Sequence, residues 1–169
     1  MDQIPEVLAN GISARAPDWS REKIRGFWDP GAKLLRALRR YQAARTRGGP
    51  GGHLAARHWA LVHRVWCVLT QCDIPLCVQI EGGLILPHPN GIVIHPEARI
   101  GPNCLIFQQV TLAGAVRLGG HVDIGAGARL IGPLMVGDHA EIGANAVVTR
   151  DVEARAVVAG VPARQIGTR

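Results

Sequence analysis

The feature of this chain that most constrains its fold is an aliphatic residue repeated at every sixth position. The first series consists of Ile94, Ile100, Ile106, Leu112, Leu118, Ile124, Leu130, Val136, Ile142 and Val148. A second series stands four places after each member: Ala98, Cys104, Val110, Val116, Val122, Ala128, Leu134, Ala140, Ala146 and Val152. A helix requires apolar spacings of three and four, and a simple strand requires two. A period of six is typical of the hexapeptide repeats of a parallel β-helix. We therefore expect triangular coils of three hexads, with the first series inside.

The repeat changes phase early in the chain. The hexads at Ile74, Ile80 and Leu86 are two residues out of phase with the later ones, and residues 89–93 absorb the offset. A break in a regular array is a place where side chains can leave the lattice. His88 stands beside this break.

Residues 1–72 are predicted to form a helical region, and residues 73–169 a β-helix domain with a short C-terminal tail. Asp29 before Pro30 is a favourable helix start, because aspartate caps free N–H groups and proline suits the first turn. The glycine-rich run at residues 48–52 is expected to break the chain. It separates two apolar stripes: Leu34, Leu35, Leu38 and Tyr41, then Leu54, His58, Leu61, Val62, Val65 and Leu69. We expect the two helices to pack together and against the end of the β-helix.

Composition narrows the class of protein. The 169 residues suffice for one domain with an appendage, and the aromatic content of 4% suits an aliphatic interior. No run of about 18 apolar residues is present, and residues 1–6 lack the order of a signal peptide. We therefore expect a cytoplasmic protein without a membrane partner.

The chain has four cysteines, Cys67, Cys72, Cys77 and Cys104. Their spacing matches neither the cysteine pairs of zinc sites nor a disulfide framework. Buried free thiols are expected, with a catalytic cysteine as the alternative.

The net charge of +6 comes largely from arginine. One stretch holds Arg36, Arg39, Arg40, Arg45 and Arg47. These residues are typical of the solvated face of an amphipathic helix; an acidic partner or an anionic cofactor is the functional alternative. No nucleic-acid recognition motif accompanies the charge, so no nucleic-acid partner is expected.

Several segments of the chain resemble the serine O-acetyltransferase family. They are DIP at 73–75, LPHPNGIVIHP at 86–96, FQQVTL at 107–112, IGAGA at 124–128 and AGVPAR at 159–164. The resemblance implies a left-handed parallel β-helix, a handedness that departs from the usual right-handed crossover. It also implies a homotrimer, or a dimer of such trimers, with active sites between neighbouring subunits.

In the family an aspartate and a histidine fifteen residues apart form a catalytic dyad, and Asp73 and His88 match it. Histidine titrates near neutral pH, so it can take the acceptor's hydroxyl proton and pass it to the departing CoA thiolate. A carboxylate on the other ring nitrogen fixes the tautomer and stabilises the imidazolium. The structural alternatives are a turn histidine beside prolines and an aspartate that caps the β-helix.

The resemblance also implies binding residues for acetyl-CoA and for a small-molecule hydroxyl acceptor, L-serine. Acceptor-binding residues are Asp29, His95 and Gln108. Small residues that let the pantetheine arm approach the backbone are Gly114, Ala126 and Ala144. Arg164 meets a CoA phosphate. No metal is expected.

His121 and His139 stand eighteen residues apart, hence one coil apart at the same corner. A zinc site of the β-helical carbonic anhydrase kind uses histidines across a subunit interface. The ligand spacing of that family is not present here, so we expect the two rings to stack on the surface.

Three departures from the family bear on the acceptor and on the partners. Residues 113–117 stay in register where many members extrude a substrate-contacting loop, and Pro87 replaces an acid before the catalytic histidine. Residues 165–169 lack the tail that docks into the sulfhydrylase, which argues against that complex.

The leading hypothesis is a serine O-acetyltransferase of cysteine biosynthesis. The alternatives are an acetyl-CoA-dependent O-acetyltransferase acting on a sugar or secondary-metabolite hydroxyl, and a non-catalytic trimeric scaffold.

Overall fold

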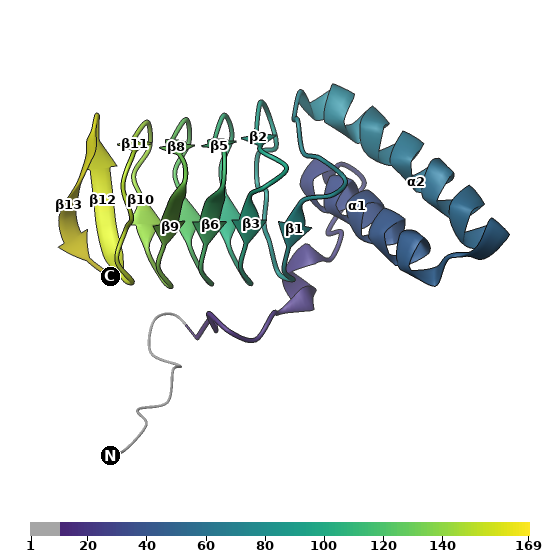
Figure 1. Cartoon of the computed structure of the whole chain (residues 1–169), viewed down its shortest axis with the longest axis horizontal. Helices are drawn as coiled ribbons and strands as arrows, with labels where there is room; N and C mark the ends of the chain where they lie inside the picture. Colours follow the sequence, from purple (N-terminus) through teal and green to yellow (C-terminus); the bar gives the residue numbers. More distant parts are fainter. Residues whose placement is uncertain (1–10) are drawn as a thin grey trace, which may run out of the picture.

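The computed structural model describes residues 11–169 and consists of a left-handed parallel β-helix with a helical hairpin at one end (Figure 1). The fold class expected from the six-residue repeat is thus confirmed. Part of the predicted helical region, residues 1–10, lies outside the described residues. A short 3₁₀ turn, η1 (Trp19–Glu22), precedes α1 (Pro30–Arg47) and α2 (Gly49–Thr70).

The β-helix has three sheets, one for each side of the triangular coil. Its parallel strands are β1 (Gln79–Ile80), β2 (Val93–Ile94), β3 (Arg99–Ile100), β4 (Leu105–Ile106), β5 (Thr111–Ala113), β6 (Val116–Leu118), β7 (Asp123–Ile124), β8 (Arg129–Ile131), β9 (Leu134–Val136), β10 (Glu141–Ile142), β11 (Val147–Val148) and β12 (Ala156–Gly160). The sheet orders are β1-β3-β6-β9, β2-β5-β8-β11 and β4-β7-β10-β12-β13, in which β13 (Ala163–Thr168) is an antiparallel edge strand. From β2 to β11 every third strand therefore joins the same sheet, as the period of three hexads predicts.

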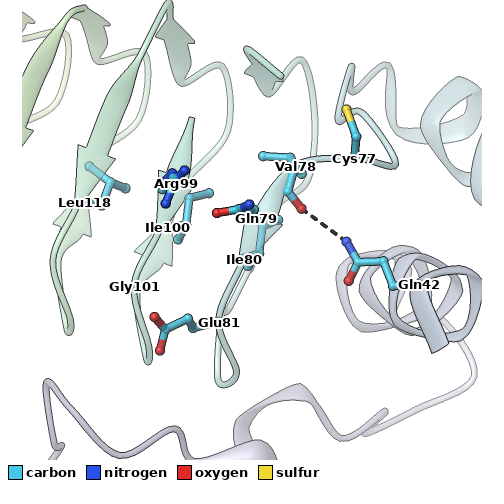
Figure 2. A pocket seen from close by; sticks show the side chains of 10 residues that line it. All are labelled: Gln42, Cys77, Val78, Gln79, Ile80, Glu81, Arg99, Ile100, Gly101 and Leu118. Atoms are coloured by element: carbon cyan, nitrogen blue, oxygen red, sulfur yellow. Dashed lines mark hydrogen bonds between the residues drawn. The ribbon is translucent and has the colours of Figure 1, made fainter. Parts of the chain in front are cut away.

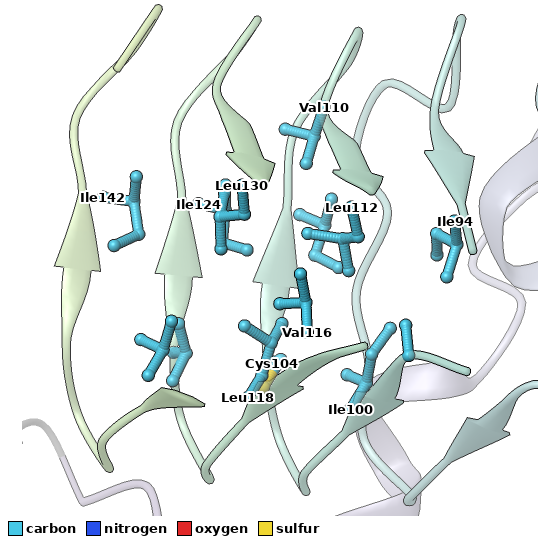
Figure 3. Packing of buried hydrophobic residues seen from close by; sticks show 14 of the residues in the cluster. Ile94, Ile100, Cys104, Val110, Leu112, Val116, Leu118, Ile124, Leu130 and Ile142 are labelled. Carbon is cyan, nitrogen blue, oxygen red and sulfur yellow. The ribbon is translucent and has the colours of Figure 1, made fainter. Parts of the chain in front are cut away.

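Both aliphatic series point into the coils. Every member of the first and second series is buried, and these side chains form one continuous core (Figure 3). Each residue lies directly above its equivalent one coil below, as Ile100 does with Leu118 in the register of β3 and β6. Each buried methylene contributes about 0.8 kcal/mol, so the stacked aliphatics supply the main driving force for folding.

The coil length departs from eighteen residues at two places. Ile80 pairs with Ile100 and Asp73 with Val93, a separation of 20 residues, whereas later coils such as Leu112 and Leu130 are 18 apart. Ile85 also pairs with Leu105, so the two additional residues lie between the Ile85 and Val93 bridges, as the phase change predicts. At the other end Ile142 pairs with Val158, a separation of 16.

The C-terminal residues form a strand rather than a free tail. β13 (Ala163–Thr168) runs antiparallel to β12 along the last edge of its sheet. Arg169 reaches back past β10 to Asp123 on β7 and forms an ion pair with it, with Nη1 2.8 Å from Oδ2. The antiparallel strand satisfies an edge that would otherwise present unpaired backbone groups.

α1 closes the opposite end of the β-helix. Leu34, Leu35 and Leu38, as predicted, are buried in the same core as the first coil. The Gln42 amide donates to the carbonyl oxygen of Val78 at 3.1 Å (Figure 2) and to that of Leu76 at 3.4 Å. Because no coil precedes β1, these side-chain donors replace the missing strand.

One arginine of the basic stretch has a structural role. The Arg39 guanidinium donates to the carbonyl oxygens of Ile80 and Glu81, and it pairs with Glu22 at 2.9 Å. It also stacks on Trp19, 5.1 Å from the ring centroid. The expectation of a wholly solvated arginine face is therefore wrong for Arg39, because the open end of the β-helix needs donors.

The break between the helices is shorter than predicted. Only Gly48, with φ of 64°, stands between α1 and α2, and the rest of the run 48–52 belongs to the first turn of α2. Gly52 faces α1 so closely that a Cβ would lie 2.9 Å from the Ala44 carbonyl oxygen. The glycines therefore permit a tight turn and a close helix contact.

α2 packs through a different face from the predicted one. The buried residues of α2 are Gly52, Ala56, His63 and Thr70. The predicted stripe is instead largely open to solvent, with Leu54 71%, Leu61 63%, Val65 49% and Leu69 58% exposed. Small residues allow the closer approach, so the helices meet on the glycine and alanine side.

The predicted histidine pair is in contact, but the rings meet edge to face at 87° rather than stacked, and they lie beneath the surface. His121 and His139 have positive φ at the same corner, and their Nδ1 atoms lie 2.8 Å apart. The expected surface position is wrong, since His121 is 2% and His139 4% exposed. Residues 13–19 run along this corner: Gly120 packs against Ala14, and the Asn103 amide donates to the Ser13 and Ala16 carbonyl oxygens.

Burial gives His121 a pH-dependent effect on stability. Its pKa is lowered, first by burial and then by the Arg169 guanidinium, against the raising effect of Asp123; His139 and Arg21 lower it further. The unfolded chain therefore binds a proton at pH values where folded His121 does not. The free energy of unfolding consequently decreases as the pH falls below about 6.5, the ordinary histidine pKa.

We expect the melting temperature to fall when the pH is lowered from about 7.5 to about 5.5. In His121→Asn this decrease should be smaller, and asparagine tolerates the left-handed backbone conformation at this corner. His58→Asn, on the exposed side of α2, serves as the control and should keep the wild-type pH profile. Equal pH profiles for wild type and His121→Asn in scanning calorimetry would contradict this assignment.

Candidate active site

Asp73 stands where the chain passes from α2 into the first coil. α2 ends at a left-handed Gln71 with φ of 53°. The Asp73 N–H donates to Ile92 O at 2.8 Å, and Ile94 N–H donates to Asp73 O at 2.9 Å. These bonds fix the Asp73 backbone against the next coil and leave its side chain exposed.

The Asp73 carboxylate affects the thiol of Cys67 in the last turn of α2. The pKa of the Cys67 thiol is raised, mainly by burial and also by the nearby Cys72 and Asp73. The His63 ring nitrogens lie 3.7 Å from Cys67 Sγ, and burial lowers the pKa of His63. Both groups are therefore held neutral, and Cys67 lacks the thiolate character of a reactive cysteine.

His88 lies in the longer coil segment created by the two additional residues. Its side chain is exposed, and its ring centroid lies 6.4 Å from that of Phe107 with a tilt of 36°. No hydrogen bond joins His88 to Asp73 within residues 11–169. The chain places Asp73 opposite Val93, five residues beyond His88, so both groups belong to the same end of the β-helix.

Three predicted binding residues, Gln108, Ala126 and Ala144, form a column along one corner of the β-helix. The column starts one coil above Asn90, and Asn90 itself stands two residues after His88 in the sequence. The backbone bonds that set its register are Gln109 N–H to Asn90 O at 2.8 Å, Gly127 N–H to Gln108 O at 2.9 Å and Asn145 N–H to Ala126 O at 2.8 Å. Because Ala126 and Ala144 are small and at least partly exposed, the corner offers an extended track for a ligand.

Gln108 has an unusual side-chain environment at the head of this column. Its Oε1 atom is buried and has no hydrogen-bond partner. Leaving a buried acceptor unpaired costs about 1–3 kcal/mol. The energetic cost is offset if a ligand donates a hydrogen bond there, so this atom is a candidate polar contact.

A cavity lies beside Pro87, the residue before His88. It has a volume of about 190 Å³ and is lined by Asp29, the first turn of α1 and residues 84–87. Asp29 caps α1: Oδ1 accepts the Ala32 N–H at 3.2 Å, and Oδ2 accepts the Arg25 N–H at 3.0 Å. The predicted helix cap is thus confirmed, and its carboxylate also faces a cavity.

The remaining predicted site residues lie elsewhere. His95 is exposed, and its Nδ1 accepts the Glu97 N–H at 3.2 Å within a turn. Gly114, with φ of 78°, occupies a different corner from the column. Arg164 is exposed on β13 and donates to the Ala163 carbonyl oxygen at 2.8 Å. A single chain therefore does not bring Gly114 and Arg164 to Gln108.

The other cavity, possible metal sites and possible membrane spans add no candidate site residues. The cavity of about 440 Å³ in Figure 2, between α1 and the sheet of β1, β3 and β6, includes none of the predicted site residues. Residues 11–169 contain no group of three metal-ligating side chains. Within the same residues, no helix is both long and apolar enough to cross a membrane.

The expectation of buried thiols holds for two of the cysteines. Cys72 and Cys104 are buried and free, and burial raises the pKa of Cys104 to about 12. Cys67 is half-buried, and Cys77 is exposed. The prediction is wrong for Cys77, because its position outside the hexad series turns it to solvent.

The lining of the cavity at Asp29 also includes residues that the sequence did not single out. Arg21, Glu22, Lys23 and Arg25 come from the segment before α1. This segment falls within the helical region predicted for residues 1–72. The sequence signal for a site here is the concentration of charge just before Asp29.

Comparisons with known proteins agree with these observations. The serine acetyltransferase of Mycobacterium tuberculosis is 39% identical over 125 residues, which are 69% of this chain and 53% of that protein. A serine acetyltransferase solved in complex with CoA superimposes with a TM-score of 0.69 at 31% identity, covering 82% of this chain and 57% of the other. A second solved structure, a serine acetyltransferase in complex with cysteine, gives a TM-score of 0.72 at 26% identity, with coverages of 85% and 56%.

No protein-family model matches the chain. The chain spans about half the length of the M. tuberculosis relative that it matches, 53%. The fold and the corner column together define a β-helix protein of the hexapeptide-repeat class. Within that class, the chain belongs to the serine O-acetyltransferase family.

Proposed function

We propose that this chain is a serine O-acetyltransferase, which transfers the acetyl group of acetyl-CoA to the hydroxyl of L-serine in cysteine biosynthesis in the cytoplasm. The observation that carries the proposal is the position of His88. Its ring contacts Phe107, the residue before the head of the corner column, while the preceding Pro87 lines the cavity at Asp29. A base between an extended track and a small polar cavity suits transfer from a long donor to a small acceptor.

In the proposed reaction, His88 takes the serine hydroxyl proton as the oxygen attacks the thioester carbonyl. The carbon–oxygen bond forms, the carbon–sulfur bond then breaks, and the imidazolium returns its proton to the CoA thiolate. No covalent enzyme intermediate and no metal is needed. The role given to Asp73 is to orient the imidazole and stabilise its charged form.

The proposed donor site is the corner column. Ala126 and Ala144 leave the backbone open to the pantetheine arm, and the buried Gln108 Oε1 can accept a hydrogen bond from an amide of that arm. One of the solved relatives is described as a complex with CoA. Gly114 and Arg164, which lie apart from the column in one chain, are proposed to contact the same donor from a neighbouring subunit.

The proposed acceptor site is the cavity at Asp29. The Asp29 carboxylate pairs with the serine ammonium, and His95 is assigned a positioning role near the same coil. A second candidate acceptor is a sugar or secondary-metabolite hydroxyl. It is favoured by the uncharged Pro87 and by residues 113–117, which lie flush in β5, β6 and their turn.

The proposed assembly is a homotrimer, in which active sites lie between subunits. The outer faces of the coils support it: Arg99 and Arg117 stack in register on one sheet, where like charges repel each other. On another sheet Glu141 lies in register with Asp123, whose charge Arg169 already compensates. A neighbouring face that presents Glu141 would compensate the arginine column, and three such contacts can close a ring.

Replacement of His88 by alanine should reduce turnover about 10²- to 10⁴-fold, because general-base catalysis is lost. The affinity for acetyl-CoA should change little. Asp73→Asn should also be slow, since the imidazole loses its orienting carboxylate. Steady-state kinetics with a panel of hydroxyl acceptors tests both variants. A His88→Ala enzyme with near wild-type turnover would refute the mechanism.

Replacement of Ala144 by phenylalanine should obstruct the donor track and raise the KM for acetyl-CoA about tenfold, a loss of about 1.4 kcal/mol in binding. Ala144 is exposed, so the substitution should leave folding intact. Ala154→Phe, an exposed alanine at a different corner, is the matched control and should keep the wild-type KM. Equal KM values for the two variants would exclude this corner as the donor site.

Sedimentation equilibrium should give three times the mass of the chain, or six times it for a dimer of trimers. Arg117→Glu should shift the equilibrium towards monomer, because it disturbs the charge complementarity of the faces. A monomer of wild-type protein at micromolar concentration would reject the assembly.

A further inference from the structure

We propose that the solvent side of α2 is a docking surface for one amphipathic helix of a partner protein, a helix whose apolar stripe is flanked by aspartate or glutamate. The surface, which we name the α2 seam, consists of Leu54, His58, Leu61, Val65 and Val68. None of these residues belongs to the candidate active site, so the inference does not rest on the proposed function.

The α2 seam lies opposite the side of the helix that packs on α1. With about 3.6 residues per turn, Leu61 projects away from the buried Ala56 and His63. Figure 1 shows α2 at the end of the molecule away from β13. Four seam residues have large exposed fractions, and His58 is exposed as well: Leu54 71%, Leu61 63%, Val65 49% and Val68 70%. Single exposed apolar residues are ordinary, but a continuous row along one helix indicates an interaction site.

The spacing of the α2 seam is that of helices packed side by side. Its members follow one another at four, three, four and three residues. A mean period of about 3.5 residues keeps one narrow stripe facing a partner helix over several turns. From Leu54 to Val68 the stripe is about 21 Å long, at a rise of about 1.5 Å per residue. This length equals two heptads, enough for a helix to lie along it.

The borders of the α2 seam set the charge of the partner. Arg57 and Arg64, seven residues apart, line one border. Both are exposed, and within residues 11–169 neither forms an ion pair. Leu69, which is 58% exposed, extends the apolar surface at the other border. Side chains at such border positions select the partner of a packed helix through their charges.

The whole helical hairpin carries one sign of charge. Residues 30–72 contain one lysine and seven arginines but no aspartate or glutamate. Within the described part of the chain, Arg39 is the one cation of the hairpin with an ion pair, and its partner Glu22 lies outside the hairpin. A complementary surface must therefore bring its own acidic side chains.

A second copy of α2 does not meet this requirement. In an antiparallel pair the arginine borders of the two copies would face each other, and like charges repel. In a parallel pair Arg57 and Arg64 would face the apolar border of the other copy. Neither orientation supplies a carboxylate, so the charge favours a helix from a different protein.

An anionic lipid surface matches the charge of the hairpin but not its geometry. A helix at a membrane interface buries its apolar side and keeps the opposite, polar side in water. The opposite side of α2 is packed on α1 through small residues such as Gly52. The cations Arg57 and Arg64 border the seam directly, as they do in helices that pair with an acidic partner.

The test uses two designed helical peptides of three heptads, both with leucine at every stripe position. One peptide carries glutamate at the flanking positions, and the other carries lysine. In fluorescence anisotropy the full chain should bind the glutamate peptide with a micromolar Kd and the lysine peptide at least about tenfold more weakly. Added salt should weaken the complex with the glutamate peptide, because exposed charges are screened.

Three variants separate the apolar stripe from its charged border. Leu61→Glu should lower the affinity for the glutamate peptide at least about tenfold, since it places a like charge in the apolar contact. Ile166→Glu, at a similarly exposed apolar residue of β13, is the matched control and should keep the wild-type affinity. The double variant Arg57→Glu with Arg64→Glu should reverse the preference and bind the lysine peptide more tightly. A reversed preference cannot result from a loss of folding.

Equal affinity for the two peptides, or no binding of either, would overturn the proposal. Two further measurements identify the other occupants. If sedimentation equilibrium without peptide shows a larger assembly that Leu61→Glu dissociates, the occupant is a second copy and the proposal is wrong. Co-sedimentation with phosphatidylglycerol vesicles that is lost in Leu61→Glu, in a chain that binds neither peptide, would assign the surface to lipid and overturn it as well.

Discussion

The vertical stacking of inward side chains in an 18-residue register is the interaction on which the molecule depends. Strands β1 to β11 have only two or three residues each, too few to be stable alone. They persist because every aliphatic residue rests on its equivalent in the next coil while the backbone bonds to the same neighbour. Ile100 above Leu118 and Leu112 above Leu130 are examples. Burial and hydrogen bonding thus share one register, and a shift of one residue would break both.

This constraint also explains where chemistry can occur. Within the regular coils, the corners offer little more than small residues and backbone. The two additional residues between Ile85 and Val93 change one corner, and His88 is exposed there beside Phe107. Above that corner the lattice resumes, and Ala126 and Ala144 follow at regular intervals. In the proposed function, the irregular coil supplies the base and the regular coils supply a straight track beside it.

The sequence was sufficient to predict those features that depend on the repeat. The buried series, the phase change, the Asp29 cap and the contact between His121 and His139 all follow from counting residues. The features it did not reveal depend on contacts between distant segments. Burial of the histidine pair depends on residues 13–19 lying along the same corner, far away in the chain.

The predicted buried face of α2 is wrong for a related reason. Both sides of this helix carry apolar residues, so periodicity alone could not select the face. Selection depended on how closely α1 could approach, and Gly52 beside the Ala44 carbonyl decided it. Likewise, the charged segment 21–25 could be assigned to a cavity only after α1 was placed against residues 84–87. The candidate roles of His88, Ala126 and Ala144 came from the resemblance to the family, whereas the cavity at Asp29 required the tertiary fold.

The two closures of the β-helix have a consequence for the behaviour of the protein in concentrated solution. A stack of identical coils has no intrinsic length, and an open end would template further strands, as in fibrils. At one end Gln42 and Arg39 occupy carbonyl groups that an incoming strand would need. At the other, β13 runs antiparallel to β12 and presents the wrong direction for another parallel coil. The molecule is therefore protected against end-to-end polymerisation, and its sides are the surfaces left for specific assembly.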